Sequence, residues 1–222
     1  MEQNEIMSIY NSNNRIASYK KPKIEVIKPE EAPLTFWVLG NIAFATSTFL
    51  LGLRNFYSYN PIFLSIFGFW LPGWGQIIIG IMAYKFKLYL DGNTYFFFGI
   101  NYIVCSCYDL FPVWGWMKPL THIEYGLHNL MCVMFIIVFF IQNLFGKSKL
   151  LIALNSSILL CFLLCTIGDF ANNKILHKIS GIFNFTTAFI SYYNVLAMVI
   201  NNKRNRITLP LFDGTHIGQL LD

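Results

Sequence analysis

Six long apolar stretches, separated by short polar segments, constrain this 222-residue chain more than any other feature. Each stretch approaches the roughly 20 residues that an α-helix needs to cross about 30 Å of hydrocarbon, whereas a barrel strand needs only about 10 residues. The sequence therefore predicts an all-α membrane protein with six transmembrane helices around a central path. The expected spans are Leu34–Leu53, Pro61–Tyr84, Thr94–Trp114, Ile123–Leu144, Leu150–Phe170 and Ile179–Asn201.

Composition supports a membrane protein and divides the chain into three parts. Only 12% of the residues are charged, against about 25% in soluble proteins. Residues 1–33 are polar and lack the apolar core of a signal peptide, so they are expected to form a disordered cytoplasmic tail. Residues 34–201 form the expected transmembrane domain, and residues 202–222 a short cytoplasmic C-terminal tail.

Lysine and arginine are distributed unequally between the two sides of the expected membrane. Twelve of the sixteen lie in the N-terminal tail, the second loop, the fourth loop and the C-terminus. Because cytoplasmic segments carry an excess of these residues, both termini are predicted to be cytoplasmic. The net charge of +5 then lies beside membrane lipid headgroups, so no nucleic-acid partner is expected. The plasma membrane is favoured, with an organelle membrane as the alternative.

The sequence carries none of the enzyme signatures sought. There is no phosphate-binding loop, no His-Glu-x-x-His and no Gly-x-Ser-x-Gly. All five cysteines lie within expected spans, where thiols usually pack as small hydrophobes, and none has metal-ligand spacing with a histidine. We therefore expect no enzymatic activity, no metal site and no cofactor.

Uncharged polar side chains recur within the first, third, fifth and sixth spans. Polar groups in hydrocarbon tend to face a bundle interior or a wet path, although each of them can instead link two helices. The candidates for a substrate path in these spans are Asn41, Thr46, Ser47, Thr48, Asn101, Asn155 and Ser157.

The second span is interrupted by Pro72-Gly73-Trp74-Gly75. Proline removes a backbone donor and glycine relaxes the backbone, so a kinked or broken helix is expected near Pro72. Interrupted helices can line a cavity or merely pack with a kink. Gln76, which follows directly, is therefore another candidate for the path.

Several short segments occur in the order in which a known family carries them. They are Phe44–Asn55 (FATSTFLLGLRN), Gly75–Tyr84 (GQIIIGIMAY), Gly92–Thr94, Thr166–Phe170 (TIGDF), His177 and Arg206–Pro210. Together, over about residues 32–213, they resemble the acetate uptake transporter family. That family includes bacterial succinate-acetate permeases and fungal acetate and ammonium transport proteins.

The resemblance implies a six-helix protomer that assembles as a homohexamer and carries acetate or related monocarboxylates, usually with a proton. The family's path is narrowed by an aromatic, a tyrosine and a leucine, which match Phe44, Tyr102 and Ile158; an ungapped count would select Ile103 in place of Tyr102. Two alternatives stay open. One is passage of ammonia, ammonium or another small polar solute, and the other is a non-transporting membrane sensor or scaffold.

This chain departs from the family at two motifs. The Asn-Pro-Ala-Pro-Leu-Gly-Leu motif is reduced to Ala32-Pro33-Leu34, and a glutamate near the end of the second helix is replaced by Ala83. Moving an ionised carboxylate into hydrocarbon has a large desolvation cost. The acid and its proton are therefore expected to cross together, even without the family's glutamate.

Three acids lie toward the outer ends of the expected spans, namely Asp109, Glu124 and Asp169. Asp109 and Asp169 are the candidates for proton coupling, because acids at a membrane border are rare. The expected partners are Lys118, Lys174 and Lys178, in a wet outer vestibule. His177 is expected to be a satisfied surface or interface histidine.

Overall fold

The fold is that of a computed structural model, in which residues 34–56, 61–145, 148–204 and 207–210 are described. Six helices are long and apolar enough to cross a membrane, and the second of them consists of α3, η1 and α4 in direct succession. The predicted all-α class with six spans is confirmed. The elements are α2 (Leu34–Phe56), α3 (Pro61–Gly68), the π-helical η1 (Phe69–Trp74), α4 (Gly75–Lys85), α5 (Tyr89–Val113), α6 (His122–Leu144), α7 (Lys149–Phe170) and α8 (Lys174–Arg204).

α5 and α8 are longer, by four residues or more, than the apolar pattern indicated. α5 begins at Tyr89 rather than Thr94, and α8 runs from Lys174 rather than Ile179. The 31 residues of α8 span roughly 46 Å at 1.5 Å per residue, more than the hydrocarbon layer of about 30 Å. Polar turns therefore extend α8 beyond the apolar part that the sequence pattern detects, and Lys178 lies on a helix rather than in a loop.

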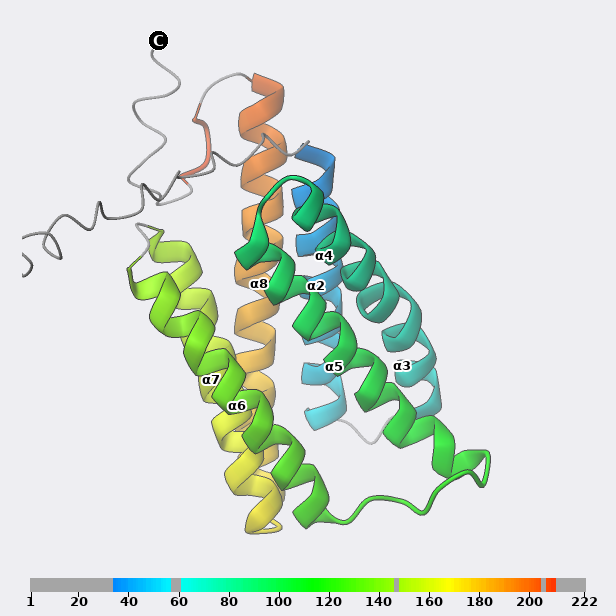
Figure 1. The fold of residues 1–222 in the computed structure, drawn as a ribbon. Coiled ribbons are helices and arrows are strands. Elements are labelled where there is room, and N and C mark those ends of the chain that lie inside the picture. Colours follow the sequence, from blue (N-terminus) through cyan, green and yellow to red (C-terminus); the bar gives the residue numbers. More distant parts are fainter. Residues whose placement is uncertain (1–33, 57–60, 146–147, 205–206, 211–222) are drawn as a thin grey trace, which may run out of the picture.

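The beginning of α2 and the end of α8 lie at the same end of the bundle (Figure 1). We call the opposite end, where α2 ends and α8 begins, the outer end. Its placement outside the cytoplasm depends on the lysine and arginine distribution and stays a prediction. The predicted N-terminal tail (1–33), most of the C-terminal tail (211–222), Lys147 and Arg206 lie outside the described residues.

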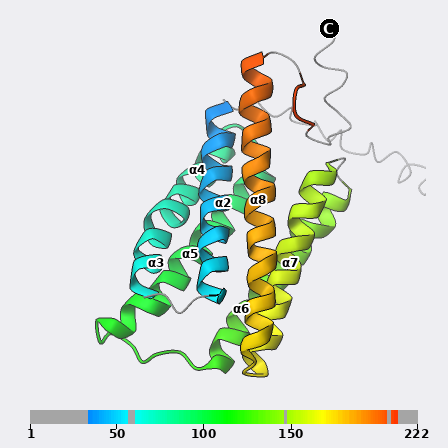
Figure 2. The ribbon, with the colours of Figure 1, turned by 180° about the vertical axis from the view of Figure 1, so that it is seen from behind.

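α2 and α8 lie side by side, with α6 and α7 on one flank and α3, α4 and α5 on the other (Figures 1 and 2). Small residues allow these two helices to approach closely. A Cβ atom at Gly52 of α2 would lie 2.8 Å from Cε1 of Phe185, and one at Gly181 of α8 would lie 2.7 Å from Cδ2 of Phe56. The α2–α8 pair therefore forms a closely packed contact between the two flanks.

The interruption predicted near Pro72 is present as a π-helical segment rather than a break. Pro72 lacks an N–H donor, and its ring displaces the preceding turn, which a wider π turn accommodates. α5 packs directly on this segment, because a Cβ atom at Gly73 would lie 2.8 Å from Cγ1 of Ile103. The second span thus stays helical throughout while one turn is widened.

Candidate functional site

A cavity of about 240 Å³ lies toward the outer end, between α2, α5, α6, α7 and α8. Since a water molecule occupies about 30 Å³ of the liquid, this volume holds a small solute together with several waters. Many of the lining residues have polar side chains, alongside apolar ones such as Leu51 and Phe162. The lining side chains that carry nitrogen or oxygen atoms are Arg54, Asn55, Asn101, Tyr125, His128, Asn129, Asp169, His177 and Asn184.

Two buried amides on opposite helices contribute N–H donors to this cavity. Oδ1 of Asn101 on α5 accepts a hydrogen bond from Cys132 at 3.1 Å, and Oδ1 of Asn184 on α8 accepts one from Cys161 at 3.1 Å. Among the described residues, neither amide nitrogen has a hydrogen-bond partner. Both residues line the cavity, so their NH₂ groups can bind an acceptor there. Asn101 was among the predicted path residues, whereas Asn184 was noted as a polar residue of the sixth span but was not selected for the path.

An apolar cluster borders the polar cavity. Phe44, Tyr102 and Ile158, three side chains that the resemblance selected, belong to this one buried cluster. Phe162 belongs to the same cluster and also lines the cavity, so the polar chamber ends directly at apolar side chains. Ile103 instead lies against Gly73, which favours Tyr102 for the matched position. The remaining buried members of the cluster are Phe98, Cys132, Val133, Ile136 and Leu154.

Asp109 on α5 is held by a cation and a hydroxyl from two other helices. Nη2 of Arg54 lies 2.8 Å from its Oδ1, and Oγ of Ser65 donates to its Oδ2 at 2.6 Å. The Asp109 side chain is only 7% exposed, so the ion pair links α2, α3 and α5 in a largely buried position. The prediction that a lysine would pair with this acid is wrong, because Arg54 occupies that position.

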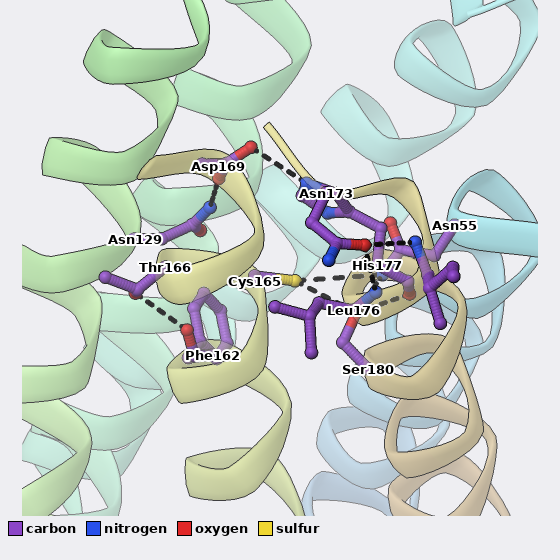
Figure 3. Close-up of polar contacts among 11 residues, drawn as sticks. Asn55, Asn129, Phe162, Cys165, Thr166, Asp169, Asn173, Leu176, His177 and Ser180 are labelled. Carbon is purple, nitrogen blue, oxygen red and sulfur yellow. Dashed lines mark hydrogen bonds and ion pairs between the residues drawn. The ribbon is translucent and has the colours of Figure 1, made fainter. Parts of the chain in front are cut away.

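Asp169 at the end of α7 forms a second polar group with its neighbours (Figure 3). Its Oδ1 lies 3.1 Å from Nε2 of His177 on α8, and its Oδ2 accepts a hydrogen bond from Nδ2 of Asn129 on α6 at 2.7 Å. The expected lysine partner is again wrong. His177 is bonded to Asp169 between α7 and α8, as expected of a satisfied interface histidine, and it also lines the cavity.

Glu124, the third acid of the predicted vestibule, has a local structural role. Its carboxylate accepts hydrogen bonds from the backbone N–H and the hydroxyl of Thr121, and Thr121 caps the start of α6 in return. This reciprocal pattern is a capping box. The spacing Thr-x-x-Glu already indicates it in the sequence.

Most of the other predicted path residues bond to helices rather than face the larger cavity. Thr46 shares a hydrogen bond of 2.9 Å with Tyr192, which links α2 to α8. Ser47 and Thr48 donate to carbonyls of their own helix, although Ser47 also lines a smaller cavity of about 30 Å³. The remaining donors are Asn41, bonded to Trp37 and Tyr95, Asn155, bonded to Leu151, and Ser157, bonded to Phe183. Their role in a path stays a prediction.

Gln76 is fully buried just after the π-helical segment. Within the described part of the chain, neither Nε2 nor Oε1 of its side chain has a hydrogen-bond partner. Ile79 and Ala83 follow at helical spacing on the same face of α4 and pack with Phe36 and Tyr95. A buried amide without partners costs free energy, and positions that retain such a cost are typical of functional sites.

Comparisons with known proteins agree with this architecture. Residues 36–214 match the sequence profile of the GPR1/FUN34/yaaH family. The solved structure of the bacterial acetate channel SatP is similar, with a TM-score of 0.75 and 22% sequence identity over 79% of this chain and 97% of that chain. At this identity the similarity shows the shared fold. A comparison with curated proteins finds no match.

Proposed function

Because this chain belongs to the GPR1/FUN34/yaaH family, we propose that it transports acetate or a related small monocarboxylate across a membrane. One observation carries the proposal, namely that a polar cavity ends directly at a buried apolar cluster. The cavity offers amide N–H donors to a carboxyl group, and the apolar cluster admits only a solute that has lost its hydration shell. The similar fold of an acetate channel supports the same solute class.

The apolar cluster implies that the solute crosses in its neutral form. An ionised carboxylate in a low-dielectric region has a large desolvation cost, whereas the protonated acid is a small neutral molecule. Ala83, which stands where the family has a glutamate, is fully buried in an apolar cluster with Phe36 and Tyr95. The proton is therefore proposed to cross on the substrate itself, past a constriction formed by Phe44, Tyr102 and Ile158.

Uptake of labelled acetate into proteoliposomes at external pH 5 and 7 tests this function. Uptake is expected to be faster at pH 5, where more of the acid is neutral, and to be inhibited by short monocarboxylates such as lactate. Inhibition by ammonium instead of lactate and succinate would favour the ammonium alternative. Uptake equal to that of empty vesicles, from folded protein, would contradict transport and favour a sensor or scaffold.

Replacing Ile158 by Trp is expected to obstruct the constriction. Ile158 is 1% exposed within the cluster, so a larger side chain there overpacks the core at a cost of about 1–3 kcal/mol. When the solute's passage bears this cost, the barrier rises by the same amount and acetate uptake becomes roughly 5- to 150-fold slower. The matched control is Ile167→Trp on the same helix, at a position that is 53% exposed. Equal uptake rates for the two variants would exclude Ile158 from the path.

Replacing Gln76 by Met is expected to stabilise the protein while slowing acetate uptake. Removing a buried amide without partners should raise the free energy of unfolding by about 1–3 kcal/mol, because Met has a similar shape and no polar desolvation cost. Slower uptake would follow if the free amide contacts the solute. The control is Gln142→Met on α6, because the Gln142 side chain is partly exposed. A stabilised variant with unchanged uptake would assign Gln76 to packing.

We also propose that six copies assemble as a homohexamer, as the family resemblance implies, and that the plasma membrane rather than an organelle membrane holds them. α6 supplies suitable surface, because Leu127, Met131, Phe135 and Val138 expose apolar side chains along it. Native mass spectrometry of the purified chain measures the number of copies directly. A monomeric mass with retained acetate uptake would contradict assembly without affecting the transport proposal.

A further inference from the structure

We infer that His177, held in place by Asp169, exchanges the proton that accompanies the acid through the outer cavity. This inference rests on the proposed transport of a small carboxylic acid and identifies the residue that performs one of its steps. Nε2 of His177 lies 3.1 Å from Oδ1 of Asp169, and both residues line the cavity. The His177 side chain is 29% exposed, so protons reach it from the aqueous side, whereas Asp169 is 11% exposed and anchored by Asn129.

The charges around His177 make the entry of an anion into the cavity depend on whether His177 is protonated. Arg54 of α2 is paired with Asp109, so these two charges offset each other. Arg54 and Asp169 both line the cavity, but Arg54 is already paired with Asp109. Asp169 of α7 is therefore the lining acid without a permanent counter-charge among the described residues, and it repels an arriving carboxylate. A protonated His177 offsets Asp169, which leaves the cavity neutral and able to admit an anion. Lys174 and Lys178 on α8 are exposed to solvent and do not line the cavity.

The other titratable groups near His177 are less suited to this exchange. His128 of α6 lies 3.6 Å from Cys105, 3.7 Å from Cys132 and 3.4 Å from the Tyr108 hydroxyl, with no carboxylate at ion-pair distance among the described residues. The Cys165 thiol of α7 donates to Ser180. Tyr125 of α6, like Cys105 of α5, is neutral at ordinary pH.

Asp109, a predicted candidate for coupling, is also less suited. Both of its oxygens are engaged, one by Arg54 and the other by Ser65. Protonating this carboxyl would break the buried ion pair, which is costly because Arg54 would lose its counter-charge. Asp109 therefore fixes Arg54, while Asp169 holds a histidine that can release its proton without losing a permanent charge.

The exchange conserves protons at each stage. A carboxylate enters while His177 carries a proton on each ring nitrogen. One N–H bond breaks and an O–H bond forms on the solute, so the imidazole becomes neutral and the acid becomes neutral. The acid then crosses the apolar cluster, and water on the outer side returns a proton to His177. One proton thus moves with each acid molecule and is released with it at the inner end.

The test compares full-length wild type, His177→Gln and the control His122→Gln in proteoliposomes, with labelled acetate outside and a pH dye inside. His122 is exposed at the start of α6, at the same end of the bundle, and does not line the cavity. His177→Gln should take up acetate at external pH 7 about 100-fold more slowly, the low end of what a positioned proton-transfer group contributes. At pH 5, where external acid is already partly neutral, its rate should approach that of wild type. The control should match wild type at both values.

A second variant and a binding measurement separate positioning from folding. Asp169→Asn retains His177 but removes the negative charge beside it, so the midpoint of the uptake-against-pH profile should move to a more acidic value. A purely structural role for Asp169 would scale the rate without moving the midpoint. Titration calorimetry with acetate, in two buffers of different ionisation heat, should show proton uptake on binding by wild type and loss of that uptake in His177→Gln.

The outcomes distinguish this inference from the function on which it rests. If wild type transports acetate and both variants keep its pH profile and its proton uptake, the inference is overturned and transport stands. If wild type neither transports nor binds acetate, the proposed function fails and the inference fails with it. If His177→Gln does not fold, as judged by size-exclusion chromatography, the midpoint of the uptake-against-pH profile of Asp169→Asn decides whether the inference stands.

Discussion

Replacing Arg54 by Met is expected to lower the free energy of unfolding by about 3 kcal/mol, at the low end of the cost of breaking a buried ion pair. The reason is that Asp109, only 7% exposed, would keep its negative charge with Ser65 as its remaining donor. We expect the low end of this cost because the Arg54 side chain is 32% exposed and its charge is partly screened by water. Equilibrium unfolding in mixed detergent micelles measures this difference.

The same ion pair predicts an asymmetry between its two partners. Asp109→Asn should cost less than Arg54→Met, because the arginine left behind can reach water whereas the aspartate cannot. Combining both substitutions should recover most of the loss, since no buried charge then remains uncompensated. The control Lys178→Met removes an exposed cation of the outer end and should change the stability by less than about 0.5 kcal/mol. Equal effects of Arg54→Met and Lys178→Met would contradict a buried pair.

The spans could be predicted because hydrocarbon imposes a length and a composition on each helix regardless of its neighbours. Lipid-facing and core-facing positions are both apolar, so a span such as α7 is recognisable without knowing which side is buried. The same property limits the prediction of contacts. An apolar pattern on all sides does not fix the rotation of a helix about its axis, and rotation decides which polar residues meet.

Thr46 and Asn184 illustrate this limit. Both are uncharged polar residues within an apolar span, and the sequence gives no reason to separate them. In the structure Thr46 bonds to Tyr192, 146 positions away, whereas Asn184 lines the cavity. The grouping of Phe44, Tyr102 and Ile158 likewise depended on a family resemblance, because these residues come from three different helices and meet only in the folded bundle.

Asp109 and Asp169 show why the lysine partners predicted for them were wrong. The sequence placed Asp109 and Asp169 at the correct end of the bundle, but loop lysines were the nearest cations in the predicted order. Long lysine side chains extend into water at helix ends, so they leave acids that point inward to other donors. Arg54 in the last turn of α2 and His177 in the first turns of α8 point toward the cavity and meet the acids instead.

Gly99→Ala is expected to be the other strongly destabilising change, and it connects the packing of α5 to the site. A Cβ atom at Gly99 would lie 2.8 Å from the carbonyl oxygen of Gly73, 2.8 Å from Cγ1 of Ile77 and 2.9 Å from the backbone nitrogen of Ile77. Two of these three atoms belong to the backbone, so side-chain rotation cannot relieve the contact. The cost should reach about 3 kcal/mol, the upper part of the range for overpacking.

The matched control for Gly99→Ala is Gly75→Ala on the facing helix, where an added Cβ atom would meet nothing within 4 Å. That change should be neutral or stabilising by up to about 1 kcal/mol through helix propensity. Because Asn101 and Tyr102 follow Gly99 within one turn, displacing α5 at Gly99 also moves a cavity donor and a constriction side chain. Gly99→Ala should therefore slow acetate uptake even under conditions in which the folded fraction equals that of Gly75→Ala. Loss of stability with unchanged uptake per folded molecule would instead show that the path does not depend on the close approach of α5 to the π-helical segment.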